Sequence, residues 1–241
     1  MVAAHGFGYL GQALSSAELF GTLLTVFWRP GHDHFVLSPA HYIVAVYAAG
    51  VELGMLGEAE LESYGRDGSR LEAIGTESSP VVDVTCGSLG QGLSAAVGLA
   101  LSDRLNRRDA QTYAFLSDGE MQEGQVWEAA MFAAHHGLDR LTVLIDCNNS
   151  QVDGPVDQIV AIEPLAAKWE AFGWHVVDID GHDLSQIHAA LSTAVSASRP
   201  AAIMARTSTM HGATLPADVD GHFVKLPPSL AAELIAELEA A

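Results

Sequence analysis

The chain has 241 residues, a formal charge of −19 and a mean hydropathy of +0.21. A chain of this length with 49% apolar residues can bury a full core, which excludes a disordered protein. It carries 11 Lys and Arg residues against 30 Asp and Glu residues, so it lacks the clustered cations that bind phosphate backbones, and we expect no nucleic-acid partner.

The cysteines and the start of the chain indicate where the protein works. Cys86 and Cys147 both lie in apolar, strand-like segments, where buried reduced thiols are expected rather than a disulfide. The first residues lack the basic and apolar regions of a signal peptide, and no apolar run reaches membrane-spanning length without Gly, Pro or charge. We therefore expect a cytoplasmic protein with no membrane contact.

Helical and strand-like segments alternate along the chain. Helical apolar spacing occurs at residues 17–28, 39–54, 93–108, 120–137, 163–172, 184–197 and 227–241. Strand-like runs occur at residues 35–38, 81–86, 112–117, 141–146, 175–180 and 200–208. This alternation predicts a parallel sheet with helices on both faces, a doubly wound α/β fold formed by residues 1–241 as one domain.

Three loops follow predicted strands, and ligands in such folds bind outside the carboxyl ends of the strands. The first loop is "GSLGQG" at 87–92, where Gly87, Gly90 and Gly92 would let the backbone approach an anion. The helix that follows would offer free N–H groups and the positive end of its dipole. The loop therefore predicts a phosphate-type ligand.

The other two loops carry oxygen donors. Asp118 follows one strand in "SDGE" and Asn148 follows the next in "CNNSQVDG", and both side chains supply the hard oxygens that a magnesium-class ion prefers. Taken alone, Asp118-Gly119 is best interpreted as an ordinary turn and Asn148-Asn149 as a cap. At matching strand ends they favour a shared divalent ion that clamps a diphosphate.

These segments resemble a known family. "SDGEMQEGQVWEAAMFAAHHGLDRLTVLIDCNNSQVDGP" closely resembles the diphosphate-binding motif of thiamine-diphosphate enzymes in its transketolase form, although Ser117 stands where the motif opens with Gly. "CGSLGQGLSAAVGLAL", "PLAAKWEAFGWHVVDIDGHD" and "DHFVLSPAH" also resemble transketolase segments. The likeness covers nearly the whole chain and implies the thiamine-diphosphate-binding fold.

The resemblance implies a metal site and a cofactor site. Asp118 and Asn148 would be side-chain ligands of Mg²⁺ or Ca²⁺, and the carbonyl of Ser150 would be a third ligand. The residues that would line the path of the aminopyrimidine and the diphosphate of thiamine diphosphate are Gly87, Ser88, Leu89, Gly119 and Glu120.

It also implies three catalytic-site residues. His41 would face the cofactor, and Glu123 would lie at a subunit interface near the activating glutamate of a partner chain. His222, in "DVDGHFVKLP", would match a late active-site histidine, with a surface histidine in a loop as the alternative.

A transketolase carries a further domain that binds the aminopyrimidine, and this chain ends where that domain would begin. The resemblance therefore implies the N-terminal subunit of a split transketolase. A separate C-terminal subunit would complete the site, most simply as an α₂β₂ assembly, and the pair would transfer a two-carbon ketol or acyl unit from a ketose or ketoacid donor to an aldehyde or acyl acceptor.

Three positions depart from the family. Tyr9 and Ile74 stand where transketolases have histidines, and Pro39 stands where lysine is common. An isoleucine can neither hydrogen-bond a sugar nor move a proton, so the departures favour a changed substrate. The alternatives are that His5, His32 or His34 compensates, or that the segment is misaligned.

Other functions remain open from the sequence. A 2-oxo acid dehydrogenase or decarboxylase α-type subunit shares the metal motif, but "GSLGQGLS" and "DGEMQEGQVWEAA" favour transketolase. A non-catalytic structural subunit fits the three departures, whereas the intact cofactor positions count against it. A nicotinamide-binding protein is disfavoured, since no acidic residue ends the next strand at the distance such a fold needs.

Overall fold

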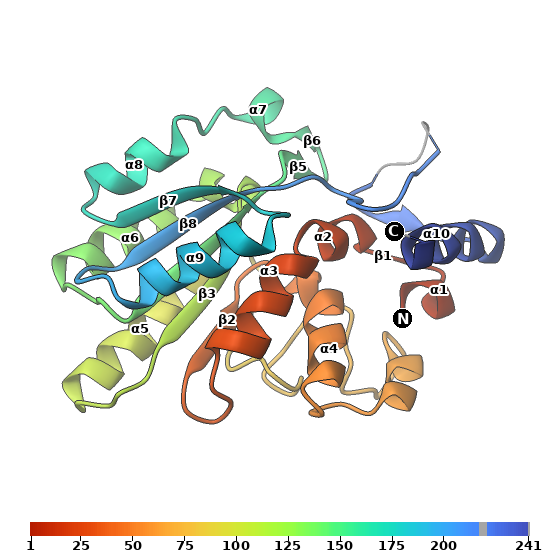
Figure 1. Ribbon diagram of the computed structural model, residues 1–241, viewed down its shortest axis with the longest axis horizontal. Helices are drawn as coiled ribbons and strands as arrows, with labels where there is room; N and C mark the ends of the chain where they lie inside the picture. Colours follow the sequence, from red (N-terminus) through yellow and green to blue (C-terminus); the bar gives the residue numbers. More distant parts are fainter. Residues whose placement is uncertain (217–220, 241) are drawn as a thin grey trace.

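A five-stranded parallel sheet forms the centre of the computed structural model, which describes residues 1–216 and 221–240 (Figure 1). Its strands, in the spatial order β2-β3-β4-β8-β7, are β2 (His34–Leu37), β3 (Thr112–Ser117), β4 (Leu141–Cys147), β8 (Ala201–Arg206) and β7 (His175–Asp180). Every neighbouring pair is parallel. The predicted doubly wound α/β fold is confirmed.

Alternate residues of each strand enter two separate apolar clusters. Tyr113 and Phe115 pack on one face of the sheet, and Ala114 and Leu116 pack on the other. The first face is covered by α3 (Ala17–Thr22), α4 (Ile43–Glu52) and α9 (Leu184–Val195). The second is covered by α5 (Gln91–Leu105), α6 (Gly124–His135) and α8 (Leu165–Ala171). Burial on both faces explains why the strands read as continuous apolar runs.

Shorter elements complete the fold. The helical ones are α1 (Val2–His5), α2 (Leu10–Ser15), the π-helical turn η1 (Leu23–Phe27), the 3₁₀ turns η2 (Ala40–Tyr42), η3 (Glu58–Ser63) and η4 (Gly119–Gln122), α7 (Val156–Ile159) and α10 (Pro228–Ala240). Two antiparallel pairs are formed by β1 (Phe7–Gly8) with β9 (Val224–Lys225) and by β5 (Ser150–Gln151) with β6 (Gly154–Pro155). Within the described residues, no helix is both long and apolar enough to cross a membrane.

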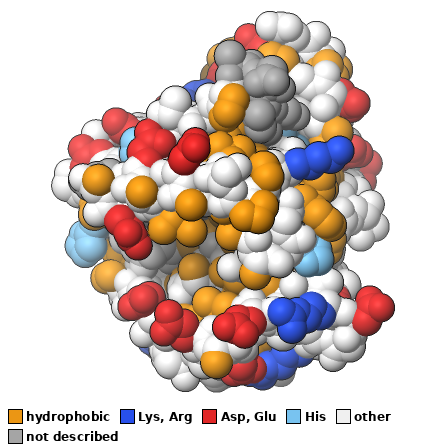
Figure 2. All heavy atoms as spheres, turned by 90° about the vertical axis from the view of Figure 1, so that its right-hand side faces the viewer, with side chains coloured by type: hydrophobic (Ala, Val, Ile, Leu, Met, Phe, Trp, Pro, Cys, Tyr) orange, Lys and Arg blue, Asp and Glu red, His pale blue; other side chains and the backbone are white. Residues whose placement is uncertain are grey.

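The two ends of the chain meet on one side of the molecule (Figure 1). There β1 pairs with β9, and the exposed rings of Phe7 and Phe223 pack 5.6 Å apart. Figure 2 shows that apolar side chains gather across the middle of this face, with acidic side chains around them.

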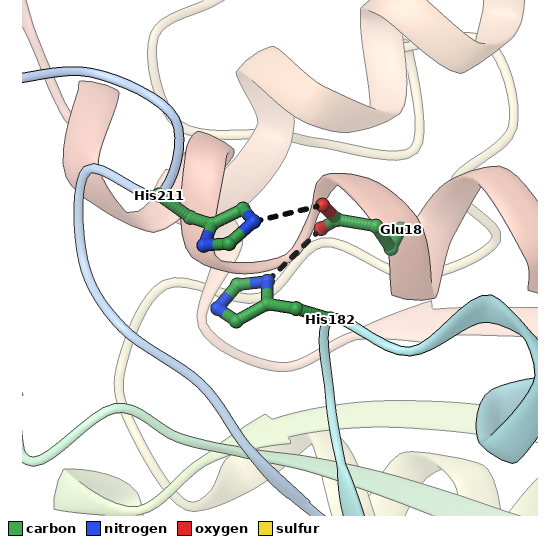
Figure 3. Close-up of side chains that lie close together, drawn as sticks. All are labelled: Glu18, His182 and His211. Carbon is green, nitrogen blue, oxygen red and sulfur yellow. Dashed lines mark hydrogen bonds and ion pairs between the residues drawn. The ribbon is translucent and has the colours of Figure 1, made fainter. Parts of the chain in front are cut away.

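The segment that follows β8 is tied to the rest of the fold by polar contacts (Figure 3). His211 of this segment lies beside Glu18 of α3 and His182 of the turn after β7. The N–H of Met210 donates to the carbonyl of Gly11 in α2 at 3.4 Å. The segment therefore bridges α2, α3 and the turn between β7 and α9.

The predicted strand at 81–86 is wrong, because this segment consists of turns and bends. The carboxylate of Asp83 accepts the N–H of Phe35 at 2.7 Å, and the N–H of Asp83 donates to the carbonyl of Phe35 at 3.2 Å. The side chain of Asp83 thus accepts the hydrogen bond that the backbone carbonyl of a neighbouring strand would otherwise accept from β2. In addition, Val81 has a positive φ of 79°, which no regular strand allows.

We predict that Asp83→Ala destabilises the fold by roughly 1 kcal/mol, since the N–H of Phe35 in the edge strand loses its acceptor. Asp83→Asn keeps an acceptor oxygen and should lose less than half as much. Urea unfolding of both variants measures the difference, and equal stability of Asp83→Ala and the parent would contradict this account of the edge.

Candidate functional site

A cavity of about 380 Å³ lies at the carboxyl ends of β2, β3 and β4. It is lined by Tyr9, His41, Tyr42, Ile74, Gly87, Leu89, Ser117, Gly119, Gln122, Glu123, Ser150, Gln151, Val152, Asp153 and His222. Seven predicted site residues are among them: His41, Gly87, Leu89, Gly119, Glu123, Ser150 and His222. The position agrees with the rule for parallel sheets, which places ligands at this edge.

Two histidines from opposite ends of the sequence meet in this cavity. The rings of His41 and His222 lie 5.7 Å apart, and the ring of Tyr9 lies 4.6 Å from His41 and 5.7 Å from His222. The amide of Gln12 donates to Nδ1 of His222, and Oγ of Ser150 lies 3.3 Å from the same nitrogen. His222 is therefore a buried member of the site and not a surface histidine in a loop.

His41 is held in its neutral form. Burial and, to a smaller extent, the neighbouring His222 together lower its pKa to about 3. A neutral imidazole can donate at one nitrogen and accept at the other, so His41 is suited to hydrogen bonding rather than to carrying a charge.

The oxygen donors lie in the turns that follow β3 and β4. Asp118 accepts the N–H of Gly119 at 2.8 Å on Oδ1 and that of Asn149 at 2.6 Å on Oδ2. Oδ1 of Asn148 accepts the N–H of Ser150 at 2.9 Å. Each oxygen therefore keeps a second lone pair that could reach a cation. Asn149 has a φ of 54°, which asparagine tolerates, and this bends the chain between Asn148 and Ser150.

A buried carboxylate that sequence reasoning missed orients Asn148. Asp146, the next-to-last residue of β4, accepts hydrogen bonds from Ser15 at 2.6 Å, from Tyr42 at 3.0 Å and from Nδ2 of Asn148 at 2.8 Å, and from Thr207. Because Nδ2 of Asn148 is fixed inward, its Oδ1 is directed to the other side. The only signal in the sequence was an acidic residue at the end of an otherwise apolar strand.

Two carboxylates are buried close together at this edge. Burial, together with the nearby Asp146, raises the pKa of Asp118 to about 7, although the N–H groups of Asn149 and Gly119 act in the opposite direction. Burial also raises the pKa of Asp146, although its four hydrogen-bond donors act in the opposite direction. A divalent cation between these turns would compensate the unfavourable charge, so the donor set and its electrostatics fit a magnesium-class ion.

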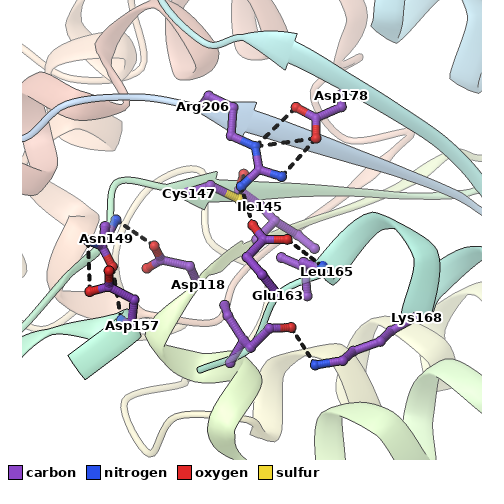
Figure 4. A network of polar contacts seen from close by, with 11 residues as sticks. Asp118, Ile145, Cys147, Asn149, Asp157, Glu163, Leu165, Lys168, Asp178 and Arg206 are labelled. Atoms are coloured by element: carbon purple, nitrogen blue, oxygen red, sulfur yellow. Dashed lines mark hydrogen bonds and ion pairs between the residues drawn. The ribbon is translucent and has the colours of Figure 1, made fainter. Parts of the chain in front are cut away.

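Asp118 also borders a second, smaller cavity of about 210 Å³, which Arg206 lines as well. Arg206 donates to Asp178 at 2.8 Å and to Glu163 at 2.5 Å (Figure 4). Because its guanidinium is paired with two carboxylates, Arg206 supplies little net charge for an anionic ligand. Asn149 and Asp157, which both line this cavity, join the turn after β4 to α7 by two hydrogen bonds.

The glycine loop at 87–92 does not leave the N–H groups free that its sequence predicts. The N–H of Gly90 donates to Oε1 of Glu120 at 2.5 Å, and the N–H of Gly92 donates to Oγ of Ser38 at 3.1 Å. The N–H of Gln91 is directed to the carbonyl of Ser88 at 3.4 Å. The prediction of free N–H groups at the start of α5 is therefore wrong for these three amides, because each of them donates to a group of the protein.

Glu120 locks this loop in place. Its side chain is fully buried and accepts from Gly90 and Ser38, so it does not line the cavity. Gly90 has a φ of 89°, and a Cβ there would come within 2.8 Å of the Cβ of Glu123. The loop thus packs directly on the start of α6, which holds Glu123 at the mouth of the cavity.

Among the described residues, the cavity is lined by acidic side chains and not by basic ones. Glu123 and Asp153 line it, whereas no Lys or Arg of the described residues does. A diphosphate placed here would face two carboxylates, and its charge would have to be met by a metal ion and by groups from outside the chain.

A parallel α/β sheet with a histidine- and acid-lined cavity at its carboxyl edge defines a class of ligand-binding proteins in which turns after the strands form the site. Within that class, the chain belongs to the transketolase family, because residues 6–238 match the transketolase thiamine diphosphate binding domain.

Two relatives of similar length are each 38% identical to the chain. All of this chain aligns with 90% of the putative uncharacterized transketolase family protein y4mO of Sinorhizobium fredii. An alignment over 97% of this chain covers 89% of the 6-deoxy-6-sulfo-D-fructose transketolase subunit SqwG of Clostridium sp.. Human transketolase is 34% identical, and this chain spans only 39% of its length.

Solved structures agree with the family. A transketolase from Pichia stipitis superposes with a TM-score of 0.87 at 27% identity over 99% of this chain and 38% of its own. Transketolase from Campylobacter jejuni gives 0.87 at 25% identity over 98% of this chain and 40% of its own. The fold is therefore that of the N-terminal part of these enzymes.

We predict that Glu120→Ala destabilises the protein by about 2–4 kcal/mol, because it leaves the buried N–H of Gly90 without an acceptor and opens a cavity. Glu120→Gln retains Oε1 and should recover most of this loss. Urea unfolding of the two variants measures the contrast, and equal losses would show that the shared acceptor does not hold the loop.

Proposed function

We propose that this chain is the N-terminal subunit of a split transketolase-like enzyme that transfers a two-carbon ketol or acyl unit with thiamine diphosphate and a divalent metal ion. The observation that carries the proposal is the cavity in which His41, His222, Gly119 and Glu123 meet at the carboxyl edge of the sheet. Family membership supports the cofactor class.

In this proposal Asp118 and Asn148 bind Mg²⁺ or Ca²⁺ through their side chains, and Ser150 binds it through its carbonyl. The free lone pairs of Asp118 and Asn148, in the turns after two neighbouring strands, support this assignment. Bound thiamine diphosphate would supply the carbanion-stabilising chemistry of the transfer.

The remaining residues bind and orient. The backbone of Gly87, Ser88, Leu89, Gly119 and Glu120 would border the diphosphate, with the side chain of Glu120 acting through Gly90. Neutral His41 would hydrogen-bond a ligand hydroxyl or carbonyl. His222 accepts from Gln12 at Nδ1, so its proton lies on Nε2, where it can be donated to a ligand.

A separate C-terminal subunit would complete the site. Glu123 is exposed at the mouth of the cavity, and the acidic lining needs positive charge from elsewhere. Two relatives have nearly the same length as this chain, one of them is named a subunit, and human transketolase is more than twice as long. An α₂β₂ assembly is the simplest arrangement that gives each N-terminal subunit one partner.

We predict that Asp118→Ala lowers the transferase activity of the complex with its C-terminal subunit by roughly 100-fold or more, because the metal loses a charged ligand. Asp139→Ala, a matched control in the loop before β4 at the opposite edge of the sheet, should leave it unchanged. Unchanged activity of Asp118→Ala would favour a structural subunit. Thiamine diphosphate retained after desalting provides a second readout.

The substrate would differ from that of a housekeeping transketolase. Tyr9 and Ile74 both line the cavity, Tyr9 beside His41. Ile74 has no group that can hydrogen-bond a sugar, and Tyr9 offers a single hydroxyl where a histidine would offer two ring nitrogens. The relative SqwG, named for a sulfonated fructose, is an example of a similar chain with an unusual sugar. A less polar ketose, a ketoacid or an acyl acceptor fits such a wall.

Accordingly, the complex should convert xylulose 5-phosphate and ribose 5-phosphate at least about 10-fold more slowly than a housekeeping transketolase, since lost substrate hydrogen bonds cost this much. A coupled assay at equal enzyme concentration measures the ratio. Equal rates would show that Tyr9 and Ile74 do not alter the substrate.

A further inference from the structure

Three side chains that line neither cavity form a compact cluster on the α3 side of the sheet (Figure 3). Glu18 comes from the first turn of α3, His182 from the turn between β7 and α9, and His211 from the segment after β8. One ligand atom from each residue lies within 4.8 Å of the others.

The separations of the two histidines from the carboxylate are close to those of metal ligands. Nδ1 of His182 lies 3.3 Å from Oε2 of Glu18, and Nε2 of His211 lies 3.7 Å from Oε1. Metal–ligand bonds of about 2.1 Å in a tetrahedral site place neighbouring ligand atoms roughly 3.4 Å apart. Each imidazole thus lies at nearly the spacing from the carboxylate that a shared ion would impose, and the ligand atoms of the two histidines lie within 4.8 Å of each other.

We propose that Glu18, His182 and His211 form a binding site for a zinc-class divalent ion, with water as the fourth ligand. Imidazole nitrogens favour zinc, nickel and copper over magnesium and calcium. The site would therefore be chemically distinct from the oxygen donors Asp118 and Asn148, which favour the harder ions.

Binding would need one local rearrangement. The N–H of Ser208 donates to Nε2 of His182 at 2.9 Å, so in the metal-free protein the proton of His182 lies on Nδ1, facing Glu18. Coordination through Nδ1 moves that proton to Nε2, and the amide of Ser208 must then turn away. The free energy of this change is subtracted from the affinity.

The two stacked imidazole rings must also move apart. His182 and His211 stack with centroids 3.5 Å apart and planes 9° apart, so their nitrogen lone pairs run side by side rather than toward one point. The side chain of His211 is 45% exposed and lies three residues after Ser208. A shift of the segment 208–211 would release the Ser208 amide, and it would also move the His211 ring out of the stack.

The consequence of binding would be a cross-link between three segments that are distant in the sequence. The ion would fix the segment after β8 to α3 and to the turn before α9, and it would stabilise the folded chain in proportion to its occupancy. This effect does not depend on the transferase function, since it requires neither the cofactor nor the partner subunit.

The test is calorimetric titration of zinc chloride into the chain, with magnesium chloride in excess and no thiamine diphosphate present. We expect one zinc ion per chain and a rise in the thermal midpoint on binding. His211→Ala and Glu18→Gln should each weaken binding at least about 10-fold, since each removes one of three protein ligands. His188→Ala, an exposed histidine on α9, and Asp118→Ala should both bind zinc as the parent does.

His211 is exposed, so its loss should leave the fold intact, and circular dichroism checks this. Unchanged zinc binding by His211→Ala would overturn the proposal. So would zinc binding that is lost in Asp118→Ala but retained in Glu18→Gln, because the ion would then belong to the other site. Absence of zinc binding by the parent chain would overturn it as well.

Discussion

The arrangement of the site depends on the hydrogen bonds that Asp146 accepts. This carboxylate is fully buried, and a buried charge is tolerated only when donors surround it. Its donors come from four places in the chain: Ser15 at the end of α2, Tyr42 in η2, Asn148 after β4 and Thr207 after β8. Because each donor satisfies the same carboxylate, the four segments hold a fixed relation at the carboxyl edge of the sheet. The side chains of the cavity, His41 and His222 among them, extend from these segments or their neighbours.

The position of Asp146 also explains why acidic groups gather at the site. Asp118 pairs its N–H with the carbonyl of Asp146 at 3.0 Å, which brings a second carboxylate into the same buried region. Burial raises the pKa of both groups, and the cavity beside them adds Glu123 and Asp153. A site lined in this way is poorly suited to an anion by itself. Its oxygen donors suit a divalent metal ion, and in the function that we propose such an ion would meet the charge of a diphosphate.

Sequence reasoning found the parts of this site that depend on local pattern. The buried strands β3 and β4 and the oxygen donors that follow them can be read from apolar runs bounded by turn residues, since parallel strands end at a common edge. The contacts that depend on distant side chains could not be predicted. The side chain of Asp83 accepts a hydrogen bond from the edge strand β2 where a further strand was predicted. The side chain of Glu120 accepts the N–H of Gly90, which the glycine pattern indicated as free. The place of His222 was fixed by Gln12 and Ser150, far away in the sequence.

The central claim is that this chain forms half of a catalytic centre. Native mass spectrometry of the protein, captured from its own producing cells, tests it most directly. The account predicts a second chain of comparable size in equal number, with thiamine diphosphate and a divalent metal ion bound to the assembly. A homodimer of this chain alone, without cofactor, would contradict it and favour a structural role for the fold.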